Sequence, residues 1–259
     1  MQGHKADRLL LEQAARDAGA LALTHFGNRP KRWSKEDNSP VSEADLAVDA
    51  RLRDILLAAR PDYGWLSEET ADTPDRLACE QVFIVDPIDG TRAFLRGEQG
   101  WCIALAVATG GKVTASAIYA PVTDTLYSAA LGDGAYRDGA VLSGSGRTSI
   151  EGASISIPRD YLAANHWPGG APPVTAARSG ALALRLARAA SGEVDGSVSL
   201  RPVWEWDSSA GTLLAMEAGL LATREDGQPT VFNSATPRHQ GLIVAPPPLH
   251  AALVAARSG

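Results

Sequence analysis

Three short apolar runs follow one another in the middle of the chain, and their spacing restricts the possible folds more than any other feature. The runs cover residues 101–109, 113–119 and 125–129, and Gly110-Gly111 and Pro121 separate them. Runs of this length bounded by Gly or Pro are typical of buried strands. Further turn signals follow at residues 132–134 and 138–139. The pattern predicts an antiparallel meander, preceded by a short buried strand at residues 81–85.

Amphipathic and Ala/Leu-rich segments on both sides of this region predict helices. We expect helices at residues 6–26, 41–60, 181–191, 208–218 and 249–256, and short strands near residues 220–224, 230–232 and 241–245. The Pro/Gly-rich stretch His166–Pro173 predicts a surface loop. Helices and strands alternate without a regular βα cycle, which favours a layered α/β fold of the α+β kind. Because no stretch is a clear linker, we expect a single domain over residues 1–259 with two halves, about 1–140 and 141–259.

The bulk composition argues against several classes of protein. The 259 residues carry a net charge of −6, whereas a protein that binds a nucleic-acid polymer usually has a basic stripe. The first residues lack the apolar core of a signal peptide, and the longest apolar runs are far too short to span a bilayer. Cys79 and Cys102 lie in apolar surroundings, so we expect buried thiols and a reducing, cytoplasmic setting.

Two carboxylates follow the predicted strand at residues 81–85, in the stretch VDPIDGTRAF. Asp86 and Asp89 lie three residues apart, at the place where a buried strand ends. Two negative charges are costly there unless a cation offsets them. Mg²⁺ prefers oxygen ligands, and carboxylates of one tight turn can share an ion or take one each, with the Ile88 carbonyl as a further ligand. The stretch therefore favours a divalent metal site.

The residues directly after Asp89 favour an anion site. Gly90 permits a tight backbone and the close approach of a ligand. If a short helix begins at Thr91 and runs to Leu95, its free N–H groups form the positive end of a dipole. Metal ions beside such a helix N-terminus are the elements of a phosphate pocket.

Three other acidic segments lie at the edges of apolar runs: residues 37–45, Ser67-Glu68-Glu69, and Asp207 within residues 204–211. Each has a purely structural alternative. Ser42 with Asp45 is also a helix-capping pattern, adjacent glutamates are often only solvated, and Asp207 can be only a cap. The turn after Asp89 can be structural too. These alternatives stay open for each segment alone, whereas the four segments together favour a site.

Together these segments resemble the inositol monophosphatase superfamily, whose members are Mg²⁺-dependent, lithium-sensitive phosphatases. The matching motifs are Asp37-x-Ser39-Pro40-Val41-Ser42-x-Ala44-Asp45, Ser67-Glu68-Glu69, Asp86-Pro87-Ile88-Asp89-Gly90-Thr91 and Trp206-Asp207-x-x-Ala210-Gly211. They follow the superfamily's order and extend from about residue 35 to residue 211. The resemblance implies an αβαβα sandwich, a small phosphorylated substrate and, as in many members, a homodimer.

The resemblance also implies a set of metal ligands. Glu68, Asp86 and the Ile88 carbonyl would hold one Mg²⁺. Asp86, Asp89 and Asp207 would hold a second Mg²⁺, and Glu68 would reach a third, weaker ion through water. Two such ions, roughly 3.5–4 Å apart, can stabilise both the attacking and the leaving oxygen of an in-line displacement.

The remaining matched residues would act on phosphate and water. By resemblance, Gly90 and Thr91 bind the phosphate through backbone N–H groups, and Asp45 with the Thr91 hydroxyl orients and deprotonates the attacking water. Glu68 belongs to the same catalytic group. No protein nucleophile is then required, which agrees with the lack of a Ser/His/Asp or Cys/His arrangement.

Three substrates compete within the superfamily: 3'-phosphoadenosine 5'-phosphate, inositol monophosphates and histidinol phosphate. Ser67, where inositol phosphatases usually have Gly, and the segment Glu205-Trp206-Asp207 resemble bacterial 3'(2'),5'-bisphosphate nucleotidases. The nucleotidase segment Gly-Ser-Ser-Leu-Lys is replaced by residues 181–185, however, and Arg92-Ala93-Phe94 is closer to the other two classes. We expect conversion of 3'-phosphoadenosine 5'-phosphate to AMP, with inositol-1-monophosphatase or histidinol-phosphatase activity as the alternatives.

Arg185, Arg201 and Glu205 are the candidate substrate contacts. Alternatively, Arg185 is an exposed helix residue and Arg201 a residue of a surface loop. Trp204 and Trp206 could stack on an adenine, although packing is the commoner use of such residues.

Rival classes differ in chemistry. A haloacid-dehalogenase-type phosphatase places its two aspartates as Asp-x-Asp, whereas Asp86 and Asp89 lie three apart, so the spacing argues against that class. The remaining rivals are a non-catalytic sensor of metal or phosphate and a protein-interaction module. All matched ligand positions carry suitable oxygens, which favours an enzyme.

Overall fold

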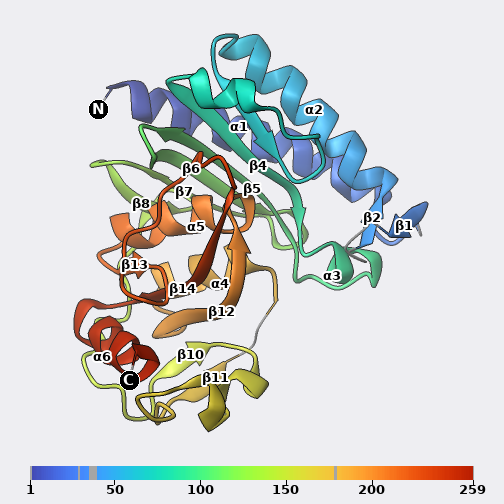
Figure 1. Cartoon of the computed structure of the whole chain (residues 1–259). Coiled ribbons are helices and arrows are strands. Elements are labelled where there is room, and N and C mark those ends of the chain that lie inside the picture. Colours follow the sequence, from blue (N-terminus) through green and yellow to red (C-terminus); the bar gives the residue numbers. More distant parts are fainter. Residues whose placement is uncertain (1, 29, 35–39, 178–179, 259) are drawn as a thin grey trace.

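The elements of the chain form stacked layers in a computed structural model that describes residues 2–28, 30–34, 40–177 and 180–258 (Figure 1). The first layer is a pair of helices, α1 (Gln2–His25) and α2 (Glu43–Ala59). A first sheet, the helices α4 (Leu182–Ala190) and α5 (Glu205–Glu217), a second sheet and the helix α6 (Pro247–Ser258) follow in that order. The predicted layered α/β fold, an αβαβα sandwich, is confirmed.

The first sheet contains the predicted meander. Its seven strands have the order β3-β4-β5-β6-β7-β8-β9. They are β3 (Gly64–Ser67), β4 (Gln81–Asp89), β5 (Cys102–Thr109), β6 (Lys112–Ala120), β7 (Thr125–Ala130), β8 (Gly134–Arg137) and β9 (Ala140–Val141). β3 and β4 are parallel, and all later neighbours are antiparallel. The meander prediction is therefore confirmed.

The central strands are apolar without alternation because both faces of the sheet are covered. In β4, Phe83 and Val85 pack into the cluster beneath α1 and α2. Val82 and Ile84 point the other way, into the cluster formed with α4 and α5. Successive side chains of a strand point to opposite faces, so β4 joins the two cores.

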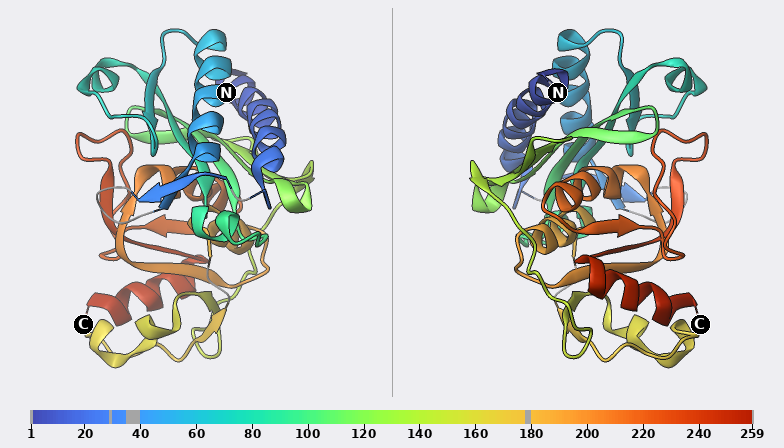
Figure 2. Two further views of the ribbon diagram at one scale, coloured as in Figure 1. Left: turned by 90° about the vertical axis from the view of Figure 1, so that its right-hand side faces the viewer. Right: turned by 90° about the vertical axis from the view of Figure 1, so that its left-hand side faces the viewer.

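The second sheet has five strands in the order β11-β10-β12-β14-β13. They are β10 (Ser154–Ser156), β11 (Thr175–Ala177), β12 (Gly196–Trp204), β13 (Leu221–Thr223) and β14 (Arg238–Ala245). A third apolar cluster lies between this sheet and α6. Because α1 is in the first layer and α6 in the last, the two ends of the chain lie at opposite ends of the stack (Figure 2).

Short elements complete the described chain. They are β1 (Arg32–Ser34), β2 (Pro40–Ser42), the helix α3 (Thr91–Leu95) and 3₁₀ turns at Pro74–Ala78, Pro121–Thr123, Arg159–Leu162 and Ala164–His166. The conditional prediction of a helix at Thr91–Leu95 is thus confirmed. No helix in the described part of the chain is both long and apolar enough to cross a membrane.

Four local predictions need correction. The expected strand near residues 230–232 is absent, since Pro229 forms only an isolated bridge with Thr223 and Phe232 N–H donates to Gly111 in a loop. The stretch 166–173 is not wholly a surface loop, because Trp167 is buried in the core beneath α6. α5 begins three residues earlier than expected, at Glu205. Of the two free cysteines, only Cys102 is fully buried.

Candidate active site

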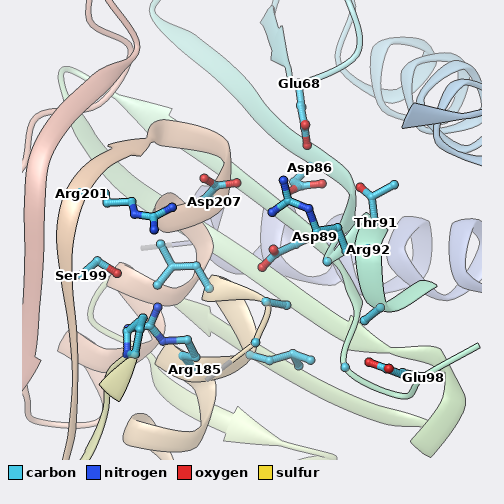
Figure 3. Close-up of a pocket in the computed structure, with 18 of the residues that line it drawn as sticks. Glu68, Asp86, Asp89, Thr91, Arg92, Glu98, Arg185, Ser199, Arg201 and Asp207 are labelled. Atoms are coloured by element: carbon cyan, nitrogen blue, oxygen red, sulfur yellow. The ribbon is translucent and has the colours of Figure 1, made fainter. Parts of the chain in front are cut away.

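The acidic residues meet at the carboxyl ends of the parallel strands β3 and β4. Ser67 pairs with Val85, and Glu68 N–H donates to the Val85 carbonyl at 3.2 Å, which places Glu68 beside Asp86. Asp207 reaches the same place from the first turn of α5. One carboxylate oxygen each of Glu68, Asp86 and Asp207 lies within 4.8 Å of the others. Three segments far apart in the sequence therefore supply one acidic cluster (Figure 3).

A bulge in β4 separates Asp86 from Asp89. Asp86 pairs with Ala104 and Asp89 with Cys102, so β4 has one more residue than β5 in this interval. Pro87, which has no N–H to donate to the ladder, lies within it. Both aspartates are thus the last part of the strand rather than a turn after it, and the bulge turns both toward the cleft (Figure 3).

Burial makes the cluster electrostatically unfavourable without a cation. Burial raises the pKa of Asp86 well above its ordinary value, and the charges of Glu68 and Asp89 raise it further. Burial likewise raises the pKa of Asp207, with Asp89 as the next cause. It raises the pKa of Asp89 to about 7, although the hydrogen bond from Ala183 N–H opposes this change. Like charges at close range disfavour ionisation of each other.

The donor set fits a hard divalent ion. Asp86 Oδ1 accepts a hydrogen bond from Ile88 N–H at 3.0 Å. Asp86 Oδ2 is buried without a hydrogen-bond partner among the described residues. A buried, unpartnered carboxylate oxygen within a carboxylate cluster is what Mg²⁺ coordination would satisfy.

Asp89 and Ile88 lie beside this cluster with partners of their own. Asp89 Oδ2 accepts a hydrogen bond from Ala183 N–H at 2.7 Å, in the first turn of α4. The Ile88 carbonyl accepts one from the Thr91 hydroxyl at 3.2 Å. Asp89 lines the same cleft as the cluster but is not one of the three residues that approach within 4.8 Å.

Gly90 is required by its backbone conformation. It caps α3 with φ of +98°, and a Cβ atom there would lie 2.7 Å from the Gly100 carbonyl oxygen. Only Gly meets both conditions without strain. The first N–H groups of α3, which have no partner inside the helix, therefore begin at the rim of the acidic cluster, where Gly90 and Thr91 line the cleft.

Asp45 is held rigidly on the other side of Thr91. Its Oδ2 accepts hydrogen bonds from Ser42 N–H at 2.9 Å and from the Ser42 hydroxyl at 2.6 Å, in a capping box of α2. Its Oδ1 accepts one from the Thr91 hydroxyl at 3.3 Å. Burial raises the pKa of Asp45, and the Ser42 hydrogen bonds oppose that rise.

The candidate substrate contacts lie in different surroundings. Arg185 and Arg201 line the cleft, which has a volume of about 580 Å³. Arg185 is buried, so the alternative of an exposed helix residue is wrong. Arg201 belongs to β12 and not to a loop.

The structure does not bring Glu205 to the cleft. Its buried carboxylate accepts hydrogen bonds from Asn233 N–H at 2.6 Å and Ser234 N–H at 3.0 Å. This corrects the expected substrate contact to a structural one, because its oxygens are engaged by a loop. Trp204 and Trp206 stack on each other, with ring centroids 4.7 Å apart, and neither lines the cleft.

Two residues near the site, Asp49 and Arg188, were not predicted from the sequence. Asp49 accepts hydrogen bonds from the hydroxyls of Ser67 and Thr70 and so fixes the segment that contains Glu68. Its position four residues after Asp45, on one face of α2, was the available signal. Arg188 also lines the cleft, and its spacing of three from Arg185 on α4 was a similar signal. Asp37 and Ser39 of the first motif lie outside the described residues.

Comparison with known proteins agrees with this geometry. The sequence profile of the inositol monophosphatase family matches residues 6–259. The chain belongs to the inositol monophosphatase family. Among curated members, an inositol-1-monophosphatase from Rhizobium meliloti is 32% identical over 197 residues, covering 72% of this chain and 73% of that protein. A putative Nus factor SuhB from Neisseria meningitidis serogroup B is 30% identical over 236 residues, with coverages of 83% and 86%.

Solved structures of the inositol monophosphatase family superimpose over nearly the whole chain. The extragenic suppressor protein suhB from Bartonella henselae has a TM-score of 0.80 and 29% identity, and the match covers 96% of this chain and 98% of that chain. The family assignment thus rests on sequence and fold together.

Proposed function

We propose that this protein is a Mg²⁺-dependent phosphomonoesterase that hydrolyses a small phosphorylated metabolite with an activated water molecule. The observation that carries the proposal is the buried, unpartnered Asp86 Oδ2 within the cluster of Glu68, Asp86 and Asp207. Membership of the inositol monophosphatase family supports the reaction class.

In this proposal the acidic residues hold two or three Mg²⁺ ions. Glu68, Asp86 and the Ile88 carbonyl would hold one, Asp86, Asp89 and Asp207 would hold another, and Glu68 would contribute to a third, weaker site. When bound, the ions lower the pKa of the attacking water and offset charge on the leaving oxygen. The chain's task is to keep its carboxylates ionised and correctly oriented.

Asp45 and Thr91 supply the proton chemistry. The Thr91 hydroxyl hydrogen-bonds both to Asp45 Oδ1 and to the Ile88 carbonyl, which supports a role for this pair in orienting the attacking water. A carboxylate whose pKa is raised by burial is a better general base near neutral pH than one in water. The N–H groups of Gly90 and Thr91 bind the phosphate oxygens.

Our first choice of substrate is 3'-phosphoadenosine 5'-phosphate, which would yield AMP. Ser67, whose hydroxyl donates to Asp49 Oδ1, supports that choice because inositol phosphatases usually have Gly there. An inositol monophosphate is the second candidate, favoured by the name of the Rhizobium relative, and histidinol phosphate is a third. A non-catalytic role stays as the remote alternative, because several relatives are named as Nus factors or putative Nus factors.

The test is a phosphate-release panel containing 3'-phosphoadenosine 5'-phosphate, inositol 1-phosphate, histidinol phosphate and fructose 1,6-bisphosphate. We expect release from at least one compound with Mg²⁺, no release with EDTA, and inhibition by Li⁺. No release from any compound in excess Mg²⁺ would favour the non-catalytic role. Because both cysteines are free thiols, we also propose that the enzyme works in a reducing cytoplasm.

A further inference from the structure

The wall of the cleft formed by α4 and β12 carries three arginines. Arg185 and Arg188 come from α4 and Arg201 from β12. Within the described residues, none of the three forms an ion pair with a carboxylate. Arg96, which also lines the cleft, differs because its Nε lies 2.9 Å from Glu98 Oε1. The wall therefore presents positive charge that the described protein does not neutralise by contact.

Arg185 is held in place within the wall of the cleft. Its side chain is buried, and Nη2 donates to the Ser156 carbonyl at the end of β10 and to the Val198 carbonyl within β12. Its Nε is buried without a hydrogen-bond partner among the described residues. A buried cation is costly unless an anion compensates it, and the carboxylate whose charge stabilises the Arg185 cation, Asp89, belongs to the proposed metal ligands.

Arg201 is preorganised at the cleft surface. Its Nε donates to the Tyr161 hydroxyl, and its guanidinium carbon lies 5.5 Å from the centre of the Tyr161 ring. Figure 3 shows the guanidinium group directed into the cleft, on the opposite side from Glu68 and Thr91. The terminal amino groups stay available for a bidentate contact with phosphate or carboxylate. Because Tyr161 already orders the side chain, a contact loses little further conformational entropy.

This wall is poorly suited to a neutral polyol. Hydroxyl groups of a polyol need hydrogen-bond acceptors as well as donors, yet α4 and β12 contribute no carboxylate to the cleft. Besides the arginines, they contribute Leu182, Leu184, Ser199 and Leu200. The scissile phosphate belongs at Gly90 and Thr91, so the arginines would face the part of the substrate beyond the leaving oxygen.

We infer that Arg188 and Arg201, with Arg185 beneath them, form a subsite for a second anionic group, so that the substrate carries two anions rather than one. This inference rests on the proposed phosphatase function and narrows its substrates to bisphosphates. A nucleoside bisphosphate and a sugar bisphosphate both supply the required chemistry, and matched pairs of compounds distinguish these two sources.

The test compares kcat/KM for 3'-phosphoadenosine 5'-phosphate with that for adenosine 3'-phosphate, and for fructose 1,6-bisphosphate with that for fructose 1-phosphate. In at least one pair we expect kcat/KM to be at least about tenfold higher for the bisphosphate, because its second phosphate gains a charge-assisted hydrogen bond. Arg201→Gln and Arg188→Gln should each lower that preference several-fold, whereas the control Arg96→Gln should keep it. An equal preference in wild type and in both subsite variants would overturn the inference.

A binding measurement separates failure of the subsite from failure of the proposed reaction. In an Asp45→Asn background with Mg²⁺, calorimetry is carried out with both bisphosphates, and the one that binds more tightly should give a Kd at least about tenfold higher after Arg201→Gln. If wild type releases no phosphate but Arg201→Gln still weakens binding, the subsite stands and the reaction is wrong. If neither Arg201→Gln nor Arg188→Gln changes Kd, the proposed subsite is contradicted, whether or not the protein hydrolyses the compound.

Discussion

The Thr91 hydroxyl lies 3.3 Å from Asp45 Oδ1, although the two residues are 46 positions apart and lie in the first turns of different helices. The same hydroxyl lies 3.2 Å from the Ile88 carbonyl. One side chain thus connects the proposed base to the strand that carries the proposed metal ligands, and this connection gives a first prediction.

Thr91→Val should lower kcat by about 10²-fold or more, because it removes the hydroxyl that orders water beside Asp45. Thr91→Ser keeps the hydroxyl and should retain most of the activity. The measurement is steady-state phosphate release at saturating Mg²⁺. Equal rates for the Val and Ser variants would contradict a role for the hydroxyl.

Removal of metal should make the fold less stable at alkaline pH. The folded pKa values of Asp86, Asp89 and Asp207 are raised, to about 7 for Asp89, so the metal-free fold binds more protons than the unfolded chain above pH 3.8. The stability from the Asp89 proton is present at low pH and is lost as pH rises through about 7, and the raised pKa values of Asp86 and Asp207 act in the same direction. In EDTA the melting temperature should be lower at pH 8 than at pH 5.5.

Mg²⁺ at pH 8 should restore the melting temperature by several degrees, because binding to the folded state alone stabilises it. Glu98→Gln, outside the cluster, should respond to Mg²⁺ as wild type does, whereas Asp86→Asn should respond much less. A melting temperature that is indifferent to both EDTA and Mg²⁺ would count against a metal site.

A buried clamp joins the loop after β3 to the start of α5. Arg76 is 2% exposed and donates to Asn233 Oδ1 at 2.6 Å and to the Ser234 carbonyl at 2.9 Å, while Glu205 accepts from the N–H groups of the same two residues. Arg76→Met should cost about 3 kcal/mol in the free energy of unfolding, because it leaves buried partners unsatisfied.

Arg224→Met is the matched control for this clamp. Arg224 pairs with Asp226, and both side chains are about half exposed to solvent. Its loss should cost less than about 1 kcal/mol. Denaturant titration measures both values, and equal losses for the two variants would show that the clamp adds no more than a surface pair.

His239 should make the fold acid-sensitive. Burial lowers its pKa from 6.5 to about 4. Between these two pH values, His239 is therefore protonated in the unfolded chain and neutral in the folded protein. Stability is therefore lost as pH falls from about 6.5 to about 4, by on the order of 3 kcal/mol. With Mg²⁺ present, His239→Gln should show a shallower loss over this window than wild type, in unfolding curves at pH 7, 5.5 and 4.5. Parallel curves would contradict this account.

The sequence predicted those parts of the fold that depend on local pattern. The runs at residues 101–129 were correctly assigned to a meander because both faces of those strands are buried. The strand Gly196–Trp204 was missed because Arg201 and Pro202 interrupt its apolar pattern and both are exposed. The strand Gly64–Ser67 was missed because four residues give too short a pattern, and its pairing with β4 decides its conformation.

Site residues could be predicted from the sequence where a motif identifies them. They were harder to predict where only tertiary contacts bring them to the site. Glu68, Asp86 and Asp207 converge as the motifs indicated. Glu205 was wrongly predicted to contact substrate. Its closeness to Asp207 in the sequence does not show which way its side chain points from the helix, and the Asn233 N–H that its carboxylate binds is distant in the sequence. Asp49 was missed because its partners, Ser67 and Thr70, come from another element.

The most direct measurement of the central claim is Mg²⁺-dependent phosphate release by Asp86→Asn beside wild type and Glu98→Gln, with the best substrate of the panel. Glu98 lines the same cleft but is paired with Arg96. We predict that Asp86→Asn loses at least about 10²-fold in kcat, since in the proposed site Asp86 would be a ligand of both ions, while Glu98→Gln keeps its Mg²⁺-dependent turnover. Wild-type turnover in folded Asp86→Asn, or undiminished turnover of wild type in EDTA, would contradict the account.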